Sequence, residues 1–160
     1  MIRAVRLSDA EAITDIHNYY IENSVANLEE RCTPLAVIEH RIETITEHFP
    51  WLVYIHDNVL IGYAYASDWK PRSGYRQTAE TTIYIKNNIE QRGIGTALYK
   101  ELIQQLKDQS FKELIGGISL PHPQSVGLHE KMGYKKVAHF SNVGYKFGQW
   151  VDVGYWQLSL

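Results

Sequence analysis

Two glycines spaced two residues apart give the clearest sign of chemistry in this sequence. Gly93 and Gly95 follow a β-rich run that ends at Lys86, and they open a stretch with helical periodicity. Glycine lets the backbone approach a ligand closely, and the first turn of a helix carries unpaired N–H groups and the positive end of the helix dipole. This strand–turn–helix pattern therefore predicts an anion site that suits a diphosphate best. A tight turn used only for packing is the alternative.

Two common phosphate-binding motifs do not fit this turn. A P-loop needs Gly-Lys-Ser/Thr at the start of the helix, whereas Thr96-Ala97 follow Gly95 here. A dinucleotide motif would place its third glycine where Leu98 stands, and it usually lies in the first strand–helix unit of a parallel sheet. The turn therefore predicts a diphosphate site of another class.

Composition limits the kind of protein. The chain has 160 residues, of which 44% are hydrophobic and 12% aromatic, so we expect one compact domain with a sizeable core. A net charge of −2 from 16 basic and 18 acidic residues argues against nucleic-acid or membrane-surface binding and favours small-molecule partners. Cys32 is the single cysteine, and neither a signal peptide nor an apolar run of about 20 residues is present, which predicts a cytoplasmic protein.

Helices and strands alternate along the chain. Ser8–Glu11 reads as a capping box, Thr33-Pro34 as an N-cap followed by the first helical residue, Asp57-Asn58 as a hairpin turn and Gly133 as a helix C-cap. Periodicity predicts strands over 2–7, 51–56, 59–67, 78–86, 114–120, 134–140 and 150–159, and helices over 8–22, 34–49, 94–106 and 124–132. The irregular segment 68–77 is interpreted as a functional loop.

The sequence resembles the GNAT superfamily of N-acetyltransferases, and more narrowly the phosphinothricin N-acetyltransferase type, which includes methionine sulfone and methionine sulfoximine acetyltransferases. The resemblance lies in residues 17–21, 65–85, 125–134 and 143–152, and in the glycine turn. The superfamily motif, Gln or Arg, two residues, Gly, one residue, then Gly or Ala, is met by Arg92-Gly93-Ile94-Gly95-Thr96-Ala97. The resemblance implies a single α/β acetyltransferase domain over 1–160, with a central mixed, mostly antiparallel sheet flanked by helices.

The resemblance also implies acetyl-CoA as co-substrate. Its diphosphate would bind the turn, and its pantetheine arm would pair with the end of the preceding strand like an added β-strand. The implied cofactor-binding residues are Ile83, Tyr84, Ile85, Gln91, Arg92, Gly93, Ile94, Gly95, Thr96, Ala97 and Ser125. One departure is His122, which stands where the family usually has Asn, three residues before Ser125.

Two residues are the candidate catalytic groups by the same resemblance. Glu80 stands where the family has its proposed general base, and burial or a water relay would have to raise its low basicity. His129 stands where many members have a tyrosine that protonates the CoA thiolate. A backbone N–H near Ile85 would stabilise the oxyanion. An exposed strand glutamate and a structural histidine are the alternatives, and we expect no acyl-enzyme at Cys32.

The acceptor site is predicted in the 68–77 loop. Arg72 and Arg76 flank Tyr75 there, and a guanidinium is the natural partner of a substrate carboxylate, although such arginines can also simply solvate a loop. The resemblance implies that Glu29 and Glu30 lie where the family's acceptor pocket closes and where a second subunit can contribute, with a solvated turn as the alternative for either residue, and it implies a homodimer. No metal is expected.

Three functions remain open on the sequence. The first is acetylation of a small amino-acid-like acceptor, such as phosphinothricin, methionine sulfoximine or methionine sulfone, by direct attack. The second is acetylation of protein or peptide N-termini, which would want an open groove without a carboxylate clamp. The third is acetyl-CoA binding without catalysis, as a sensor.

Overall fold

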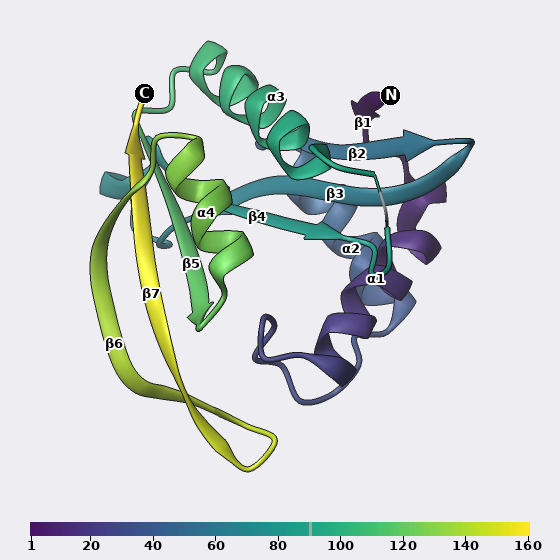
Figure 1. The fold of residues 1–160 in the computed structure, drawn as a ribbon. Coiled ribbons are helices and arrows are strands. Elements are labelled where there is room, and N and C mark those ends of the chain that lie inside the picture. Colours follow the sequence, from purple (N-terminus) through teal and green to yellow (C-terminus); the bar gives the residue numbers. More distant parts are fainter. Residues whose placement is uncertain (90) are drawn as a thin grey trace.

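A seven-stranded mixed sheet with helices on both faces forms the fold (Figure 1). The computed structural model describes residues 1–89 and 91–160; Glu90, which precedes the glycine turn in sequence, lies outside the described residues. The elements in chain order are β1 Ile2–Ala4, the 3₁₀ turn Leu7–Asp9, α1 Ala10–Asn23, α2 Leu35–Thr46, β2 Trp51–His56, β3 Val59–Asp68, the 3₁₀ turn Ser73–Tyr75, β4 Thr78–Ile85, α3 Ile94–Asp108, β5 Glu113–Leu120, α4 Pro123–Lys131, β6 Lys135–Lys146 and β7 Gln149–Ser159.

The strand order is β1-β2-β3-β4-β5-β7-β6. Among the described strands, β4 and β5 pair in parallel and the other neighbouring pairs are antiparallel, so the predicted mixed, mostly antiparallel α/β class is confirmed. Within this part of the chain, no helix is long and apolar enough to cross a membrane.

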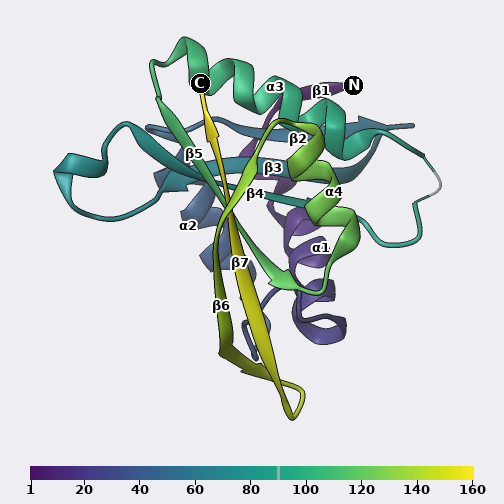
Figure 2. The ribbon, with the colours of Figure 1, turned by 60° about the vertical axis from the view of Figure 1, so that its left-hand side comes forward.

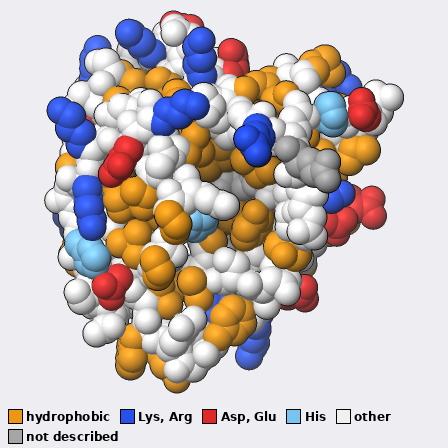
Figure 3. Space-filling model, viewed as in Figure 1, with side chains coloured by type: hydrophobic (Ala, Val, Ile, Leu, Met, Phe, Trp, Pro, Cys, Tyr) orange, Lys and Arg blue, Asp and Glu red, His pale blue; other side chains and the backbone are white. Residues whose placement is uncertain are grey.

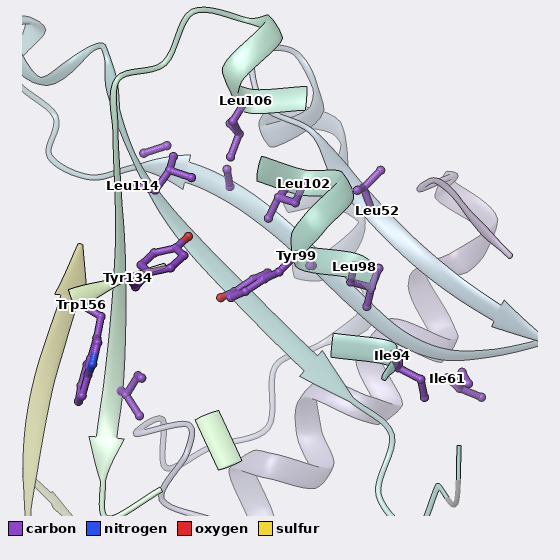
Figure 4. Close-up of a cluster of buried hydrophobic side chains, with 14 residues drawn as sticks. Leu52, Ile61, Ile94, Leu98, Tyr99, Leu102, Leu106, Leu114, Tyr134 and Trp156 are labelled. Carbon is purple, nitrogen blue, oxygen red and sulfur yellow. The ribbon is translucent and has the colours of Figure 1, made fainter. Parts of the chain in front are cut away.

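Alternating side chains of the sheet build a core on each face. On β2, Leu52 packs in one cluster with α3, whereas Trp51 and Val53 pack in the other with α1 and α2. Figure 4 shows Leu98, Leu102 and Leu106 in succession along α3, with the Tyr99 ring of the same helix directed toward the side where Tyr134 lies. This α3 stripe is fully buried, as its period of three and four residues predicts. The core therefore anchors the helix that follows the glycine turn.

Two predicted turns have the expected backbone. Asp57 and Asn58 have φ of 48° and 61°, the left-handed values that a two-residue hairpin turn requires. Gly93 has φ of 84° and is the N-cap of α3, where its carbonyl accepts the Ala97 N–H at 3.0 Å. Because few side chains tolerate that φ, glycine suits this position.

Two predicted helix starts are wrong in detail. The capping box at Ser8 does not form; Asp9 is the N-cap of α1, and its carboxylate accepts the Arg6 N–H at 2.8 Å and the Arg3 guanidinium at 2.7 Å. The ion pair with Arg3 strengthens the hold of Asp9 on the start of the helix, so Asp9 rather than Ser8 is the N-cap. Pro34 is the N-cap of α2 rather than its first helical residue.

The C-terminal hairpin is longer than the sequence predicts. β6 runs to Lys146 instead of ending near residue 140, because a register irregularity between Phe140 and Gly144 bends the strand without ending it. The hairpin of β6 and β7 reaches beyond the rest of the sheet to the segment that follows α1 (Figures 1 and 2).

Candidate active site

The central strands separate at the site. β4 and β5 pair over Thr78–Glu80 and Glu113–Ile115, and their later residues line opposite sides of a cavity of about 310 Å³. Its walls include Ile83, Tyr84 and Ile85 from β4 and Gly117–Ser119 from β5. An extended ligand with amide groups could pair with the backbone in such an opening, as an added strand does. Figure 3 shows this face of the molecule as hollowed among mostly hydrophobic and uncharged side chains.

The glycine turn follows the end of β4. A Cβ at Gly95 would lie 3.0 Å from Leu128 Cδ2, so glycine allows α3 and α4 to approach closely. Among the described residues, no atom beyond its chain neighbours lies within 4 Å of a Cβ built at Gly93, so these residues leave space on that side of the turn. The Tyr20 hydroxyl donates to the Ile85 carbonyl at 2.6 Å and fixes the end of β4. Residues 91–97, which are predicted to bind the diphosphate, do not line the cavity. They follow β4, the strand that does line it.

Glu80 lies at a junction between two cavities. Glu80 also lines a second cavity of about 330 Å³. Burial raises the pKa of the half-buried Glu80 carboxyl, and the charge of Lys70 partly offsets that rise. A raised pKa makes the carboxylate a better proton acceptor. The residues that line both cavities are Ala26, Glu80, Thr82, Tyr84, Gly117 and Ser119.

The second cavity is walled by the segment after α1 and by α2. Asn27, Leu28 and Glu29 line it together with Arg41, whose guanidinium lies 3.7 Å from the Glu29 carboxylate. His17 also lines it, and its Nε2 is buried without a hydrogen-bond partner in the described structure. A buried polar atom of this kind favours a polar ligand.

His129 is buried and bonded at both ring nitrogens. Nδ1 lies 2.8 Å from the Ser125 carbonyl, which only accepts, so Nδ1 carries the proton. Nε2 then accepts the Tyr99 hydroxyl at 3.1 Å. Burial lowers the pKa of His129 and raises that of Tyr99 well above its usual value. The neutral His129 therefore presents an accepting nitrogen toward Tyr99.

His122 caps the helix that carries His129. Its Nδ1 accepts the Ser125 N–H at 3.2 Å at the start of α4, and burial lowers its pKa. His122 and Ser125 both line the first cavity. The histidine that departs from the family pattern is thus an N-cap in this chain.

The predicted arginines of the 68–77 loop lie apart from the cavities. Arg72, Tyr75 and Arg76 are exposed and line neither cavity, and the Arg76 guanidinium donates to the Ser73 carbonyl at 3.2 Å. Figure 2 shows the loop between β3 and β4 extending away from the sheet. Their role in acceptor binding stays a prediction.

Sequence reasoning missed Arg41. The residue follows Ile38 by three positions and precedes Ile42, so it borders the apolar stripe of α2. A charged side chain beside a buried stripe is the signal that could have identified it.

Diverging central strands, a helix opened by glycines and a partly buried carboxylate together define an acyl-CoA-dependent transferase. The chain belongs to the GNAT acetyltransferase family, since the model of the acetyltransferase (GNAT) domain matches residues 2–154. The enzyme is therefore an N-acetyltransferase that uses acetyl-CoA.

Two curated relatives are similar over nearly the whole chain. Phosphinothricin N-acetyltransferase of Streptomyces viridochromogenes is 40% identical over 157 residues, which cover 98% of this chain and 85% of the relative. L-methionine sulfoximine/L-methionine sulfone acetyltransferase of Pseudomonas aeruginosa is 30% identical, covering 99% and 94%.

Solved structures agree with the fold. A phosphinothricin acetyltransferase from Sinorhizobium meliloti in complex with AcCoA matches with a TM-score of 0.97 and 33% identity, covering 100% of this chain and 88% of that one. A ribosomal-protein-alanine N-acetyltransferase from Brucella melitensis also gives a TM-score of 0.97, with 30% identity and coverage of 100% and 99%.

Proposed function

We propose that residues 1–160 act as a single acetyltransferase domain that acetylates the amino group of a small amino-acid-like acceptor of the phosphinothricin or methionine sulfoximine/sulfone type. The observation that carries this proposal is the place of Glu80, which borders both cavities. A donor in the first cavity and an acceptor in the second would meet beside its carboxylate. Two curated relatives with such acceptors in their names support this substrate class.

Glu80 is the proposed general base. An amino acid enters as an ammonium ion, and the nitrogen must lose a proton before it can attack the thioester. The burial that raises the pKa of Glu80 brings it closer to the pH at which the enzyme works. The amine attacks the acetyl carbonyl directly, and the C–S bond breaks as the thiolate leaves.

The donor is proposed to follow β4 toward the glycine turn. Ile83, Tyr84 and Ile85 would face the pantetheine arm, and Ser125 lies on the same cavity wall. The N–H groups from Gln91 to Thr96 would bind the diphosphate, assisted by the dipole of α3, whereas the Ala97 N–H is already bonded to the Gly93 carbonyl.

His129 and Tyr99 are the candidates for protonation of the thiolate. Because His129 Nε2 accepts from the Tyr99 hydroxyl, Tyr99 carries the proton between the two side chains. Burial raises the pKa of Tyr99 well above its usual value, so Tyr99 is a weak acid. The proposal keeps the acid role on His129, which would act once its Nε2 takes up a proton, with Tyr99 as its hydrogen-bonded partner. Both residues line the first cavity.

The acceptor carboxylate is assigned to Arg41 in this proposal. Arg41 lines the second cavity, and its salt bridge with Glu29 presents opposite charges next to each other. A zwitterionic amino acid carries the same two charges, so it can pair with both side chains. Arg72, Tyr75 and Arg76 stay a separate hypothesis for the same carboxylate.

A homodimer and a cytoplasmic location complete the proposal. The C-terminal hairpin exposes aromatic side chains, with Phe147 at 59% and Trp150 at 65% of their full accessible surface. Aromatic residues are enriched in protein interfaces relative to the rest of the surface, which supports an interface at this hairpin. The cytoplasmic location is supported by the exposed free thiol of Cys32, which suits a reducing compartment.

Acetylation of a protein N-terminus is the second candidate. The Brucella relative, named as a ribosomal-protein-alanine N-acetyltransferase, favours it. The charged pair of Arg41 and Glu29 in the acceptor cavity speaks for the small zwitterion instead. If the protein binds acetyl-CoA but acetylates none of the amines tested, the sensor hypothesis would be favoured.

The test measures CoA release from acetyl-CoA with a thiol reagent. Acceptors are free amino acids, methionine sulfone, methionine sulfoximine, phosphinothricin and short peptides. Glu80→Gln should lower kcat/KM by about 10²–10⁴-fold and leave acetyl-CoA binding unchanged. Glu43→Gln, on the exposed face of α2, is the matched control. Activity on peptides alone would replace the small-acceptor proposal with acetylation of a peptide N-terminus. A Glu80→Gln variant with unchanged kcat/KM would exclude Glu80 as the general base.

A further inference from the structure

Lys146 is a buried lysine without an assigned role. It ends β6, its side chain is 2% exposed, and its ammonium donates to the carbonyls of Ser24 at 2.8 Å and Asn27 at 2.6 Å. These partners lie 122 and 119 residues earlier in the chain. A charge is rarely buried in this way unless several acceptors surround it.

The two carbonyls belong to the segment that leaves α1. Ser24 is the C-cap of that helix, where carbonyls lack partners within the helix and the dipole is negative. A cation there satisfies both the hydrogen bonds and the dipole. The ammonium also lies 4.8 Å from the centre of the Phe147 ring. The lysine therefore fixes the backbone where α1 ends.

A second contact joins the hairpin to the same segment. A Cβ at Gly144 would lie 2.9 Å from Leu28 Cδ1, so the Leu28 side chain fits against a strand position without a side chain. Gly144 and Lys146 both belong to β6. Figure 1 shows the hairpin reaching toward the segment after α1. The hairpin thus holds residues 24–29 at two points.

Residues 24–29 form a wall of the second cavity. Ala26, Asn27, Leu28 and Glu29 all line it. The Asn27 side chain accepts the Glu29 N–H at 2.8 Å, so a shift of Asn27 is passed on to Glu29. Glu29 in turn pairs with Arg41, and both residues line the cavity. The position of the acceptor-binding charges therefore depends on the anchored backbone.

We propose that Lys146 is a positioning residue for acceptor binding, which holds the 24–29 wall through the Ser24 and Asn27 carbonyls. This inference rests on the proposed function, because it assumes that the second cavity receives the acceptor. Lys146 touches neither substrate and lines neither cavity. Its loss should thus affect the acceptor and leave the donor site, built on β4 and α3, as it is.

The test compares Lys146→Met with Lys146→Arg and with a control, Lys135→Met, at the exposed start of β6. Lys146→Met should raise the acceptor KM about tenfold or more, since two charge-assisted hydrogen bonds are lost. The dissociation constant of acetyl-CoA should stay within about twofold. Lys146→Arg keeps the charge and should recover part of the acceptor affinity. Lys135→Met should behave as wild type.

Two further measurements keep the inference testable. Gly144→Ala, which presses on Leu28, should raise the acceptor KM in the same direction even if Lys146→Met folds poorly. Amide hydrogen exchange should increase over residues 24–29 in Lys146→Met and not in α3. These exchange rates need no acceptor, so they test the anchor even if the wild type acetylates no small amine. Equal changes in both substrate affinities, or unchanged exchange over 24–29, would overturn the inference.

Discussion

Gly116→Ala tests whether His129 is held rigidly beside β5. A Cβ at Gly116 would lie 2.6 Å from His129 Nε2 and 2.7 Å from Cδ2, whereas ordinary contacts begin near 3.4 Å. The ring would have to move by about 0.8 Å, the difference between 3.4 and 2.6 Å. It is bonded to Ser125 and Tyr99 and packs edge-on against the Tyr99 and Tyr134 rings, each with centroids 5.1 Å away.

The cost follows from those contacts. Overpacking a tight site costs about 1–3 kcal/mol, and a lost hydrogen bond adds about 1 kcal/mol. The variant should therefore be less stable by about 2–4 kcal/mol, which lowers Tm by roughly 4–16 °C for a protein of this size. The displaced ring also crowds the first cavity, so acetyl-CoA should bind more weakly.

Urea and thermal unfolding provide the measurement. Gly127→Ala is the control, because Gly127 lies within α4 and its added Cβ would meet no atom of another described element within 4 Å. Alanine also favours a helix by up to about 1 kcal/mol. The control should unfold at or above the wild-type temperature. If Gly116→Ala also unfolds at that temperature, His129 is free to move, and the protonation state assigned to it from its two hydrogen bonds loses its basis.

The other predictions concern pH, the donor site, the acceptor site and assembly. Burial lowers the pKa of three histidines in the folded protein, so below about pH 6.5 the unfolded chain binds more protons than the folded chain. The free energy of unfolding, measured in urea titrations, should therefore fall from pH 7 to pH 5. A flat profile would contradict this. These histidines are His17, His122 and His129. Tyr20→Phe removes the bond to the Ile85 carbonyl and should raise the KM of acetyl-CoA several-fold with the acceptor KM unchanged, and the reverse pattern would place Tyr20 at the acceptor. Arg41→Gln should raise the acceptor KM about tenfold or more in steady-state assays, and an unchanged value would return the carboxylate to the 68–77 loop. Trp150→Glu should shift a dimer toward monomer in light scattering, whereas an unaltered mass would move the interface elsewhere.

Local signals in the sequence were enough to predict most helices and strands, although not all of their ends. Gly93 needs a left-handed backbone, Asp57-Asn58 favours a hairpin, and the apolar spacing of α3 requires a buried face. Each of these depends on residues close together in the chain. The resemblance then correctly predicted the mixed sheet.

The contacts on which the proposed acceptor site depends could not be predicted in the same way. Lys146 reads as an ordinary surface lysine because its partners lie more than one hundred residues away. Arg41 and Glu29 meet only after α2 packs beside the segment that leaves α1. Asp9, rather than Ser8, caps α1, because Arg3 donates a hydrogen bond to the Asp9 carboxylate, and this contact forms only in the folded chain. Long-range contacts decide these features, and no linear pattern encodes them.

The separation of β4 from β5 has an evolutionary consequence. In the proposed site the donor is bound mainly by main-chain groups, so most side-chain substitutions outside the glycine turn would leave affinity for the thioester largely intact. Acceptor preference, in the same proposal, depends instead on a short connecting segment and on the β6–β7 hairpin, neither of which belongs to the β4–α3 unit. Selection, or an engineer, can therefore vary residues 24–29 and the hairpin end as a library and obtain new acceptors without rebuilding the half of the enzyme that handles acetyl-CoA.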